Sequence, residues 1–482
     1  MCGIVFLDGP NAEHRLAACI DKINHRGPDE MNIWKQSDKA LGFTRLAING
    51  RGETSRQPYF DGDWVGAVNG EIYNYKELIS EYELPVSYDN DTQVLLPLYQ
   101  KCNASLINIL DGFYAAVLYD HENKKLIVLR DYIGKKPLFY GCSGSEFFIT
   151  SELKAISSIC YFKTVPKGLT RFNLQTREIS EVVEHQFPDT ICQDDVETIL
   201  HEAVRKRLPV APQQVGLFLS GGLDSSIIAA EASKLRTDIT YFTLGSEDSE
   251  DSLMVKEVVK SLGLKNVRFI STPTDDLLEQ YIEEVVRITE SFNPSIISNG
   301  LATYMLAQAA RTEGIKVVLT GEGADELFGG YFNYLEPNEL VVRRNQLISD
   351  MHYTELRRLD LCTMAHSVEA RCPFLDKSVI SLSDGLLFTD IYADGFNKAI
   401  LRKTYQNQLP KLIIERPKVS FDVGSGIRKL VVQFLTRNGR SEREELQQIW
   451  ARYYENKVLD KYFYRYPAFD SAIDRRRGDS HR

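Results

Sequence analysis

The sequence lacks several features that would define the class of the protein at once. Its 482 residues include eight cysteines but no Cys-x-x-Cys pair, so neither a zinc site nor a disulfide framework is indicated. No apolar run approaches the roughly 20 residues that a membrane-spanning helix needs. The net charge of −10 argues against binding to nucleic acid or a membrane surface, because both depend on concentrated positive charge. There is also no G-x-x-x-x-G-K-[ST] phosphate loop, no internal repeat and no low-complexity tract.

The composition is that of a soluble globular protein, with 43% hydrophobic and 26% charged residues. Its length exceeds what one hydrophobic core usually serves, so two domains are expected. No charged-then-apolar leader precedes Cys2, and we expect a reducing, cytoplasmic location. The basic tail at 474–482 is expected to be frayed and solvated. Seven cysteines are expected to be ordinary buried thiols: Cys19, Cys102, Cys142, Cys160, Cys192, Cys362 and Cys372.

The first half of the chain is a series of short apolar runs separated by turn residues, which predicts strands. These runs are 2–8, 40–48, 64–70, 113–120, 125–131, 137–141, 146–151 and 170–174. Helical patterns interrupt them at 12–24 and 92–102. We therefore predict two antiparallel sheets with helices packed on them.

The pattern changes after residues 185–195, where periodicity is lost and where we place a linker. An amphipathic helix over 196–208 opens the second half. Strands are predicted at 215–220, 239–245, 267–271 and 317–321, with helices between them. This alternation predicts a parallel, doubly wound sheet. From about Tyr331 the chain is expected to be mostly helical.

Cys2 directly follows the initiator methionine. Removal of Met1 would leave a thiol and a free α-amine on one residue, and an amine with a pKa of about 7.7–8.0 can act as the general base for its own thiol. A second-position cysteine can equally be a small apolar residue at the start of a strand. The motifs farther along the chain favour the nucleophile.

The segment SGGLDSS at 220–226 lies between a predicted strand and a predicted helix. Glycines allow a backbone to approach an anion closely, and the unpaired N–H groups at a helix start bind phosphate. A loop at this position in an open α/β sheet is a common ligand site. It therefore predicts a phosphate-binding loop of a type different from that of kinases.

Two sets of motifs carry a family resemblance over residues 2 to about 425. The segments MCGIV, HRGPD at 25–29, RLAI at 45–48, NGEIYNY at 69–75 and DT at 91–92 resemble a class II glutamine amidotransferase domain. SGGLDSS, TGEGADELFGGY at 320–331 and SVEARCPFLD at 367–376 resemble the synthetase domain of glutamine-dependent asparagine synthetases. The resemblance implies an α-β-β-α Ntn-hydrolase sandwich over 2–188. It implies an α/β domain of the ATP-pyrophosphatase, adenine nucleotide α-hydrolase-like type over 193–482.

For the first domain, the resemblance implies that Cys2 is the nucleophile and that Asn69 and Gly70 supply the oxyanion hole. Arg45, Asp91 and Glu71 would bind the charged groups of glutamine. His25 is expected to order a loop rather than to catalyse. Two positions depart from the usual family pattern, namely Gln93 after Asp91–Thr92 and Asn49 after RLAI.

For the second domain, the resemblance implies an ATP site and a catalytic pair. Asp224 and Asp325 would hold Mg²⁺ between phosphates, with Glu322 and Glu326 ranked below them as possible surface carboxylates. Glu369 would assist the attack of ammonia, with Arg371 as its neighbour. Lys418 would stabilise charge that develops on phosphate, a role that Arg402 and Arg416 could also serve. The residues expected at ATP are Leu217, Ser220, Gly221, Gly222, Asp224, Ser225, Leu244, Gly321 and Glu322.

Together these features predict a ligase that makes asparagine from aspartate, with glutamine as nitrogen donor and ATP split to AMP and diphosphate. Ammonia would pass between the two sites through an enclosed tunnel. One alternative is a related enzyme acting on another carboxylate in a sugar, antibiotic or peptide pathway; relatives that close β-lactam rings typically lack the cysteine. A catalytically silent sensor and a stand-alone glutaminase are two further alternatives. A homodimer is the family expectation, without nucleic-acid or membrane partners.

Overall fold

The computed structural model describes residues 2–50, 52, 55–86, 89–186, 195–246, 248–331 and 337–454. These residues fall into two compact units, and the change from one unit to the other lies between residues 186 and 195. Most of the predicted linker, Cys192 and the basic tail lie outside the described residues. The domain boundaries proposed above therefore stay a prediction.

The first unit contains two six-stranded antiparallel sheets. One sheet has the order β10-β8-β9-β1-β3-β2 and the other has the order β12-β11-β7-β6-β5-β4. The strands of the first sheet are β1 (Cys2–Asp8), β2 (Glu30–Gln36), β3 (Lys39–Arg45), β8 (Phe139–Ser143), β9 (Glu146–Thr150) and β10 (Ile159–Thr164). The strands of the second sheet are β4 (Tyr59–Asp61), β5 (Trp64–Ile72), β6 (Gly112–Asp120), β7 (Lys125–Arg130), β11 (Gly168–Asn173) and β12 (Glu178–Val183).

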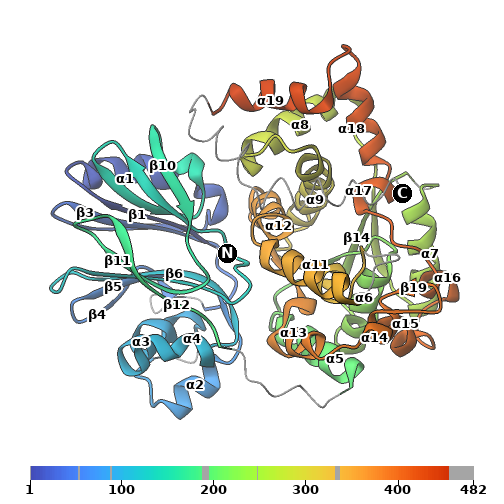
Figure 1. Ribbon diagram of the computed structural model, residues 1–482, viewed down its shortest axis with the longest axis horizontal. Coiled ribbons are helices and arrows are strands. Elements are labelled where there is room, and N and C mark those ends of the chain that lie inside the picture. Colours follow the sequence, from blue (N-terminus) through green and yellow to red (C-terminus); the bar gives the residue numbers. More distant parts are fainter. Residues whose placement is uncertain are drawn as a thin grey trace. The chain divides into compact units, whose positions relative to one another are not determined.

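The two sheets pack face to face because each strand presents alternate residues to opposite sides. In β6, Ala115, Val117 and Tyr119 belong to the core between the sheets, whereas Tyr114 and Ala116 belong to a second core on the outer face. Helix α1 (Ala12–Asp21) packs on β1 and β3 of the first sheet. The result is the α-β-β-α layering of an Ntn-type domain (Figure 1).

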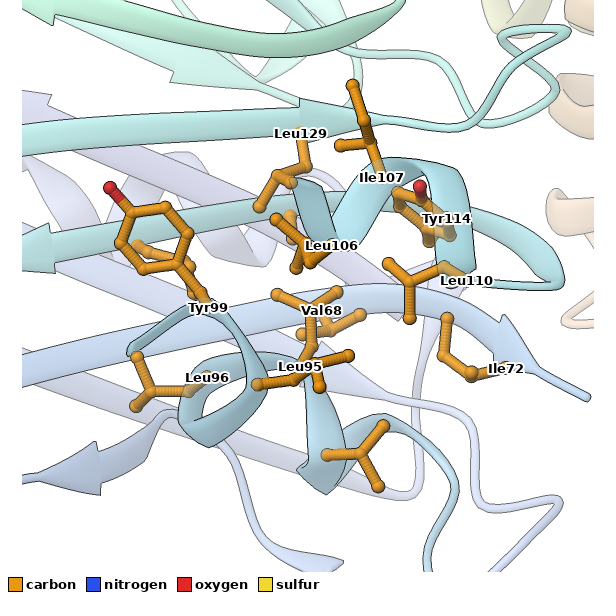
Figure 2. Packing of buried hydrophobic residues seen from close by; sticks show 14 of the residues in the cluster. Val68, Ile72, Leu95, Leu96, Tyr99, Leu106, Ile107, Leu110, Tyr114 and Leu129 are labelled. Atoms are coloured by element: carbon orange, nitrogen blue, oxygen red, sulfur yellow. The ribbon is translucent and has the colours of Figure 1, made fainter. Parts of the chain in front are cut away.

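Three short helices bury the outer face of the second sheet. They are α2 (Tyr75–Glu81), α3 (Leu95–Cys102) and α4 (Leu106–Ile109). Figure 2 shows side chains of α3 and α4, among them Leu95 and Leu106, directed toward Val68 and Leu129 on the sheet. These helices need this contact, because a helix of one or two turns is not stable alone in water.

The eight predicted strands of this unit are confirmed, as is the predicted helix over 12–24. Four strands were missed: β2, β4, β10 and β12. The segments of β2 and β12 are largely polar or partly exposed, so they carry no strong apolar signal. The expectation of seven buried thiols was wrong, since Cys160 is exposed and Cys102 and Cys142 are half-buried; Cys19, Cys362 and Cys372 are buried.

The second unit is built on a five-stranded parallel sheet with the order β15-β14-β13-β16-β17. The strands are β13 (Gly216–Phe218), β14 (Thr240–Leu244), β15 (Asn266–Ile270), β16 (Val317–Leu319) and β17 (Glu369–Arg371). The first four were predicted. The three-residue strand β17 was not, because two of its residues are charged and only their pairing allows burial.

Helices connect and cover this sheet, as the alternating sequence pattern predicted (Figure 1). Those of the connections are α5 (Val196–Arg207), α6 (Leu223–Leu235), α7 (Glu250–Leu262), α8 (Asp275–Thr289), α9 (Pro294–Thr312), α10 (Ala324–Leu327), α11 (Pro337–Asp350) and α12 (Glu355–Met364). Beyond β17 lie α13 (Lys377–Asp384), α14 (Phe388–Ile391), α15 (Ala399–Tyr405), α16 (Lys411–Ile414), α17 (Phe421–Gly424), α18 (Ile427–Thr436) and α19 (Glu442–Ala451), with one small hairpin. In the described part of the chain, no helix has both the length and the apolar character needed to cross a bilayer.

Strand order places two loops side by side. The order in which the strands are added changes direction between β13 and β16, which are parallel neighbours although about 100 residues separate them. At such a switch point, the loops leaving the carboxyl ends of the two strands diverge and form a crevice that binds ligands. The loops concerned are 219–222 and 320–323, the same segments that carry SGGLDSS and GEGADE.

Replacement of a core valine should destabilise the first unit. Val128 of β7 is fully buried between the sheets, whereas Val182 of β12 is 38% exposed. Val128→Ala should lower the free energy of unfolding by about 2 kcal/mol, since it removes two buried methyl groups and leaves a cavity. Urea denaturation of the full chain measures this loss. Val182→Ala is the matched control and should leave the midpoint nearly unchanged; an equal loss in both variants would contradict the assigned core.

Candidate functional site

Cys2 begins β1 and lies in the buried core between the two sheets of the first unit. Its backbone nitrogen donates to Oδ1 of Asn69 at 2.9 Å, and its carbonyl oxygen accepts from Nε of Arg26 at 2.9 Å. These two hydrogen bonds fix the backbone of Cys2 at its nitrogen and at its carbonyl oxygen. In the full chain the Cys2 nitrogen is an amide, and loss of Met1 would turn it into the amine that a self-activated thiol requires.

Asn69 and Gly70 offer hydrogen-bond donors beside Cys2. The Asn69 side chain is fully buried, and its Nδ2 group has no hydrogen-bond partner although its Oδ1 is used. Buried donors without a partner are rare, and a site for a developing oxyanion is one reason for them. Gly70 is required by packing, because a Cβ there would lie 2.2 Å from the carbonyl oxygen of Phe113.

The residues expected to bind glutamine gather around this pair. Arg45 is the register partner of Cys2 in β3, and its Nη2 donates to the carbonyl oxygen of Gly50 at 2.7 Å. Asn49 donates through Nδ2 to Glu71 Oε1. Asp91 is buried and accepts from the backbone N–H of Ile72 at 2.9 Å. The structure thus brings Arg45, Glu71 and Asp91 to the strands that carry Cys2 and Asn69.

Arg26 is a residue that sequence reasoning missed. It is completely buried, and besides binding the Cys2 carbonyl it donates through Nη1 to Glu152 at 2.6 Å. Nε2 of His25 lies 3.1 Å from Oε2 of Glu152, and Lys154 bonds to the same carboxylate. Burial opposes ionisation of Glu152, but the neighbouring cations outweigh it and hold the pKa of Glu152 well below its ordinary value. The HRGPD motif was the available signal, yet only its histidine was considered.

In the second unit, the loop after β13 is folded on its own hydroxyl groups. The Oγ atom of Ser225 accepts from the N–H of Ser220 at 3.2 Å, and Oγ of Ser220 accepts from the N–H of Gly222 at 3.3 Å. Helix α6 follows at once, and Gly222 leaves its N-terminus without a side-chain cap. The N–H groups of the first turn therefore remain suited to an anion. Gly221 has φ of +69°, which explains why this loop needs glycine there.

The loops after β13 and β16 are in contact. A Cβ on Gly321 would lie 3.0 Å from Cβ of Asp224. Leu217 and Leu244, expected near the adenosine, are buried in β13 and at the end of β14. In the same region, the carbonyl oxygen of Phe242 in β14 accepts a hydrogen bond from the N–H of Leu219 at 2.8 Å. This bond joins β14 to the start of the loop after β13.

Asp224 and Asp325 are joined by a lysine that sequence reasoning did not identify. Nζ of Lys398 lies 2.6 Å from both carboxylate oxygens of Asp224 and 2.6 Å from Oδ1 of Asp325. Lys418 bonds to Oδ2 of Asp325 and lies 4.0 Å from Asp224. Lys398 is only 2% exposed, which makes its pairing obligatory. No motif distinguished it, since it lies among several lysines of a helical region.

Charge compensation sets the protonation of this group. Burial opposes the charge on Asp325, but Lys398 and Lys418 reverse the effect and hold the pKa of Asp325 well below its ordinary value. For Lys418, burial likewise opposes the charge, and Asp325 and Asp224 raise its pKa above the ordinary range. Asp325 and Lys418 are therefore charged near neutral pH.

Glu322 and Glu369 occupy different ends of the sheet. Glu322 follows β16 at the carboxyl edge and pairs with the buried guanidinium of Arg358. Glu369 is the first residue of β17, where it is the register partner of Val317 at the amino end of β16. Glu369 thus begins the three-residue strand β17, and Glu322 follows the carboxyl end of its neighbour β16.

The surroundings of Glu369 are those of a buried ion pair. Its Oε1 atom accepts from Nε of Arg371 at 2.6 Å, as the adjacent arginine suggested. Arg371 also donates a hydrogen bond through Nη1 to the carbonyl oxygen of Arg207. The guanidinium of Arg207 in turn bonds to Asp376 at 2.7 Å. This network ties β17 to α5. The expectation that Glu369 is an acid/base at the ATP site stays a prediction.

A second ion pair lies beside the phosphate loop. Asp251 of α7 accepts from Nη2 of Arg416 at 2.7 Å, while its Oδ2 and the Nε of Arg416 are buried without partners. Burial raises the pKa of Asp251 to about 6, although Arg416 acts in the opposite direction. The pair joins α7 to the segment that carries Lys418. Arg402 instead bonds to backbone oxygens of residues 397, 414 and 416, which is a structural role.

The carboxylates at this edge fit Mg²⁺ only in partnership with phosphate. Asp224 and Asp325 share one ammonium group, so their oxygens converge on one point. Among the described residues, no group of three or more His, Cys, Asp or Glu side chains could hold a metal ion. Mg²⁺ commonly takes one or two carboxylates and completes its shell with phosphate oxygens and water, so the donor set suits that mode and not an all-protein cage.

The fold defines a class of protein: an Ntn-type amidotransferase domain followed by a parallel-sheet domain of the ATP-pyrophosphatase type. Sequence comparison agrees with this class. Residues 1–192 match the glutamine amidotransferase domain family, and residues 195–349 and 342–470 match the asparagine synthase family. The chain belongs to the glutamine-hydrolysing asparagine synthetase family, whose members are ATP-using ligases.

Relatives match over most of their length. A probable glutamine-hydrolysing asparagine synthetase of Acanthamoeba polyphaga mimivirus is 32% identical over 471 residues, covering 87% of this chain and 85% of that protein. The asparagine synthetase of Sandersonia aurantiaca is 31% identical and covers 88% and 87%. Among solved structures, glutamine phosphoribosylpyrophosphate amidotransferase from B. subtilis is 16% identical with a TM-score of 0.35, covering 83% of this chain and all of that one.

Removal of the buried ammonium of Lys398 should destabilise the second unit. Lys398→Met leaves two carboxylates close together with one lysine, and loss of one partner from a buried ionic group costs about 3–5 kcal/mol. The additional change Asp224→Asn removes one of the repelling charges and should restore part of that loss. Urea denaturation of the single and double variants measures the coupling. Strictly additive losses would contradict the described pairing, and Lys403→Met, on the next turn of α15, serves as control.

The raised pKa of Asp251 should appear in the pH dependence of stability. An aspartate that binds its proton more tightly in the folded chain contributes stability below about pH 4, and this contribution is lost as the pH rises through about 6. Asp251→Asn should remove this loss of unfolding free energy, which is up to about 3 kcal/mol. The stability of the variant relative to wild type should therefore increase between pH 4 and 7. Denaturation midpoints across this range test it. The exposed Asp248→Asn is the matched control, and identical pH profiles for wild type and Asp251→Asn would contradict the shift.

Proposed function

We propose that this protein makes asparagine from aspartate, hydrolysing glutamine in the first unit and using ATP in the second. The observation that carries the proposal is the presence of both sites in one chain. A buried cysteine lies beside an unpartnered amide donor in one unit, and two aspartates pair with two lysines at the switch point of the sheet in the other. Membership of the family supports the same pairing.

In the first unit, Cys2 is the nucleophile once Met1 has been removed. Its α-amine accepts the thiol proton, and the thiolate attacks the carboxamide carbon of glutamine. The Asn69 Nδ2 group and the Gly70 N–H stabilise the oxyanion, at about 2.7–4 kcal/mol for each donor. Ammonia leaves with the proton from the amine, and water then cleaves the thioester to give glutamate. Arg45 binds the α-carboxylate of glutamine, and Asp91 and Glu71 bind its α-amine.

In the second unit, the acceptor carboxylate attacks the α-phosphorus of ATP and displaces diphosphate. The first turn of α6, Lys398 and Lys418 compensate the charge of the phosphates. Mg²⁺ held by Asp224 and Asp325 would neutralise further phosphate charge. Ammonia then attacks the acyl carbon and AMP leaves. Glu369 would accept the proton that the attacking nitrogen loses, as the resemblance implies, and Glu322 at the carboxyl edge of the sheet is a second carboxylate for this role.

The identity of the acceptor is the least constrained part of the proposal. A related carboxylate from a sugar, antibiotic or peptide pathway is the alternative, since the two sites would serve it equally well. We further propose a cytoplasmic enzyme that forms a homodimer and passes ammonia from one unit to the other without release to water.

The purified protein should convert aspartate to asparagine. Incubation with glutamine, Mg²⁺-ATP and aspartate should give asparagine, glutamate and diphosphate in matching amounts, measured by mass spectrometry and a coupled diphosphate assay. Cys2→Ala should abolish glutamate release and glutamine-dependent synthesis, because no nucleophile remains. The same variant should retain synthesis from ammonium salts, since that reaction needs only the second unit.

Other outcomes would point to the alternatives. Glutamate release without asparagine or aspartate-dependent diphosphate would exclude aspartate and direct a search to other carboxylates. Glutamate release without any ATP binding would favour a stand-alone glutaminase. Absence of both activities in wild type would favour a silent relative.

A further inference from the structure

The hydrogen-bonding edge of β5 determines where the oxyanion donors point. Consecutive residues of a strand direct their N–H and C=O groups to opposite neighbours. The N–H of Ile72 bonds to Oδ2 of Asp91, and the N–H of Val68 bonds to Oε1 of Gln57 at 2.6 Å, both on the side away from β6. Gly70 lies midway between these two positions, so its N–H faces the same outer side. Because of this orientation, the Gly70 N–H can donate a hydrogen bond to a substrate instead of to the backbone of a neighbouring strand.

Strand β4 ends before it reaches this position. Its last register pair along β5 is Tyr59 with Gly66, so among the described residues no strand pairs with β5 at Val68 or Gly70 on this side. At Val68 a side chain replaces the missing strand. The amide of Gln57 accepts from the Val68 N–H and donates through Nε2 to the Val68 carbonyl oxygen at 3.1 Å, which is the two-point pairing of a peptide group.

The Gln57 side chain is buried and fixed by further polar contacts. It is 4% exposed, and its Nε2 atom also lies 3.5 Å from Oγ1 of Thr92. Thr92 accepts or donates at 3.1 Å with the hydroxyl of Tyr59, and its N–H donates to Asn90. These polar groups join the Gln57 segment to the residues flanking Asp91. One network therefore supports β5 on both sides of Gly70.

We propose that Gln57 is a positioning residue for glutamine hydrolysis: its side chain ends the sheet at Val68 and keeps the Asn69 amide and the Gly70 N–H directed at the oxyanion. The inference rests on the proposed glutaminase reaction of Cys2. Gln57 need not contact glutamine or the thiol. It acts on the peptide immediately before Asn69, where a small displacement of backbone would misdirect both donors.

The expected effect follows from how oxyanion donors act. They stabilise the tetrahedral intermediate and contribute much less to binding the planar amide of the substrate. A displaced donor should therefore lower kcat and leave KM nearly unchanged. Loss of one donor outright lowers kcat by about 10²–10³-fold, so misalignment should cost about 10- to 100-fold.

The test compares Gln57→Met with Gln36→Met in the full-length protein. Methionine keeps the length of the buried chain but removes both hydrogen bonds to Val68, and Gln36 is exposed on β2. Three quantities are measured: kcat and KM for glutamate release, affinity for an aldehyde analogue of glutamine that forms a tetrahedral adduct with a thiol, and diphosphate release with ammonium as nitrogen source.

For Gln57→Met we expect kcat to fall about 10- to 100-fold and KM to stay within about threefold of wild type. The affinity for the aldehyde should fall by about the same factor as kcat. Ammonium-dependent diphosphate release and the Gln36→Met variant should match wild type. Unchanged kcat and aldehyde affinity would overturn the inference, as would a rise in KM alone. If wild type itself releases no glutamate, the proposed function and the inference both fail.

A second variant separates positioning from folding. Gln57→Glu keeps an acceptor for the Val68 N–H and replaces the Nε2 donor to the Val68 carbonyl oxygen and to Thr92 by a carboxyl oxygen. If Gln57→Met lowers both glutamine- and ammonium-dependent activities, Gln57→Glu decides the matter. A selective fall in kcat for glutamine supports the inference, and a second parallel fall of both activities overturns it.

Discussion

Ionic groups buried in both units are matched by opposite charges that come from distant parts of the chain. Glu152 meets Arg26, Asp325 meets Lys398 and Lys418, and Asp376 meets Arg207. A buried charge without such a partner would cost several kcal/mol, so each pair constrains the fold to bring two remote segments together. The elements that carry Cys2 and the phosphate loop are placed by these constraints.

The two candidate sites use this constraint in different ways. Around Cys2 the donors aimed at the reacting centre are neutral, an amide and a backbone N–H, and the charges of Arg26 and Glu152 lie behind them. This suits a reaction in which negative charge appears only briefly. At the switch point two lysines and two aspartates are gathered together, which suits a substrate that carries several permanent charges.

Strand edges are the second recurring theme. The switch point of the parallel sheet leaves the loops after β13 and β16 free to diverge, and the short β4 leaves part of β5 uncovered. In both units a functional backbone group is available because regular pairing stops there. Side chains, namely those of Gln57 and Asp91 in the first unit and of Ser220 and Ser225 in the second, then satisfy the groups that are not needed for substrate.

The sequence by itself determined the fold class and most of the strands, because apolar runs and glycine-rich motifs act locally. Short apolar runs bounded by turn residues placed β1, β5, β6 and β7, and SGGLDSS marked the turn into α6. Lys398, Arg26 and Gln57 were not foreseen, because nothing near them in the chain shows which distant group they meet. Only the tertiary structure decided that Lys398 joins the two aspartates and that Arg26 meets Glu152, since the pairing of charges remote in sequence depends on distance in space and not along the chain.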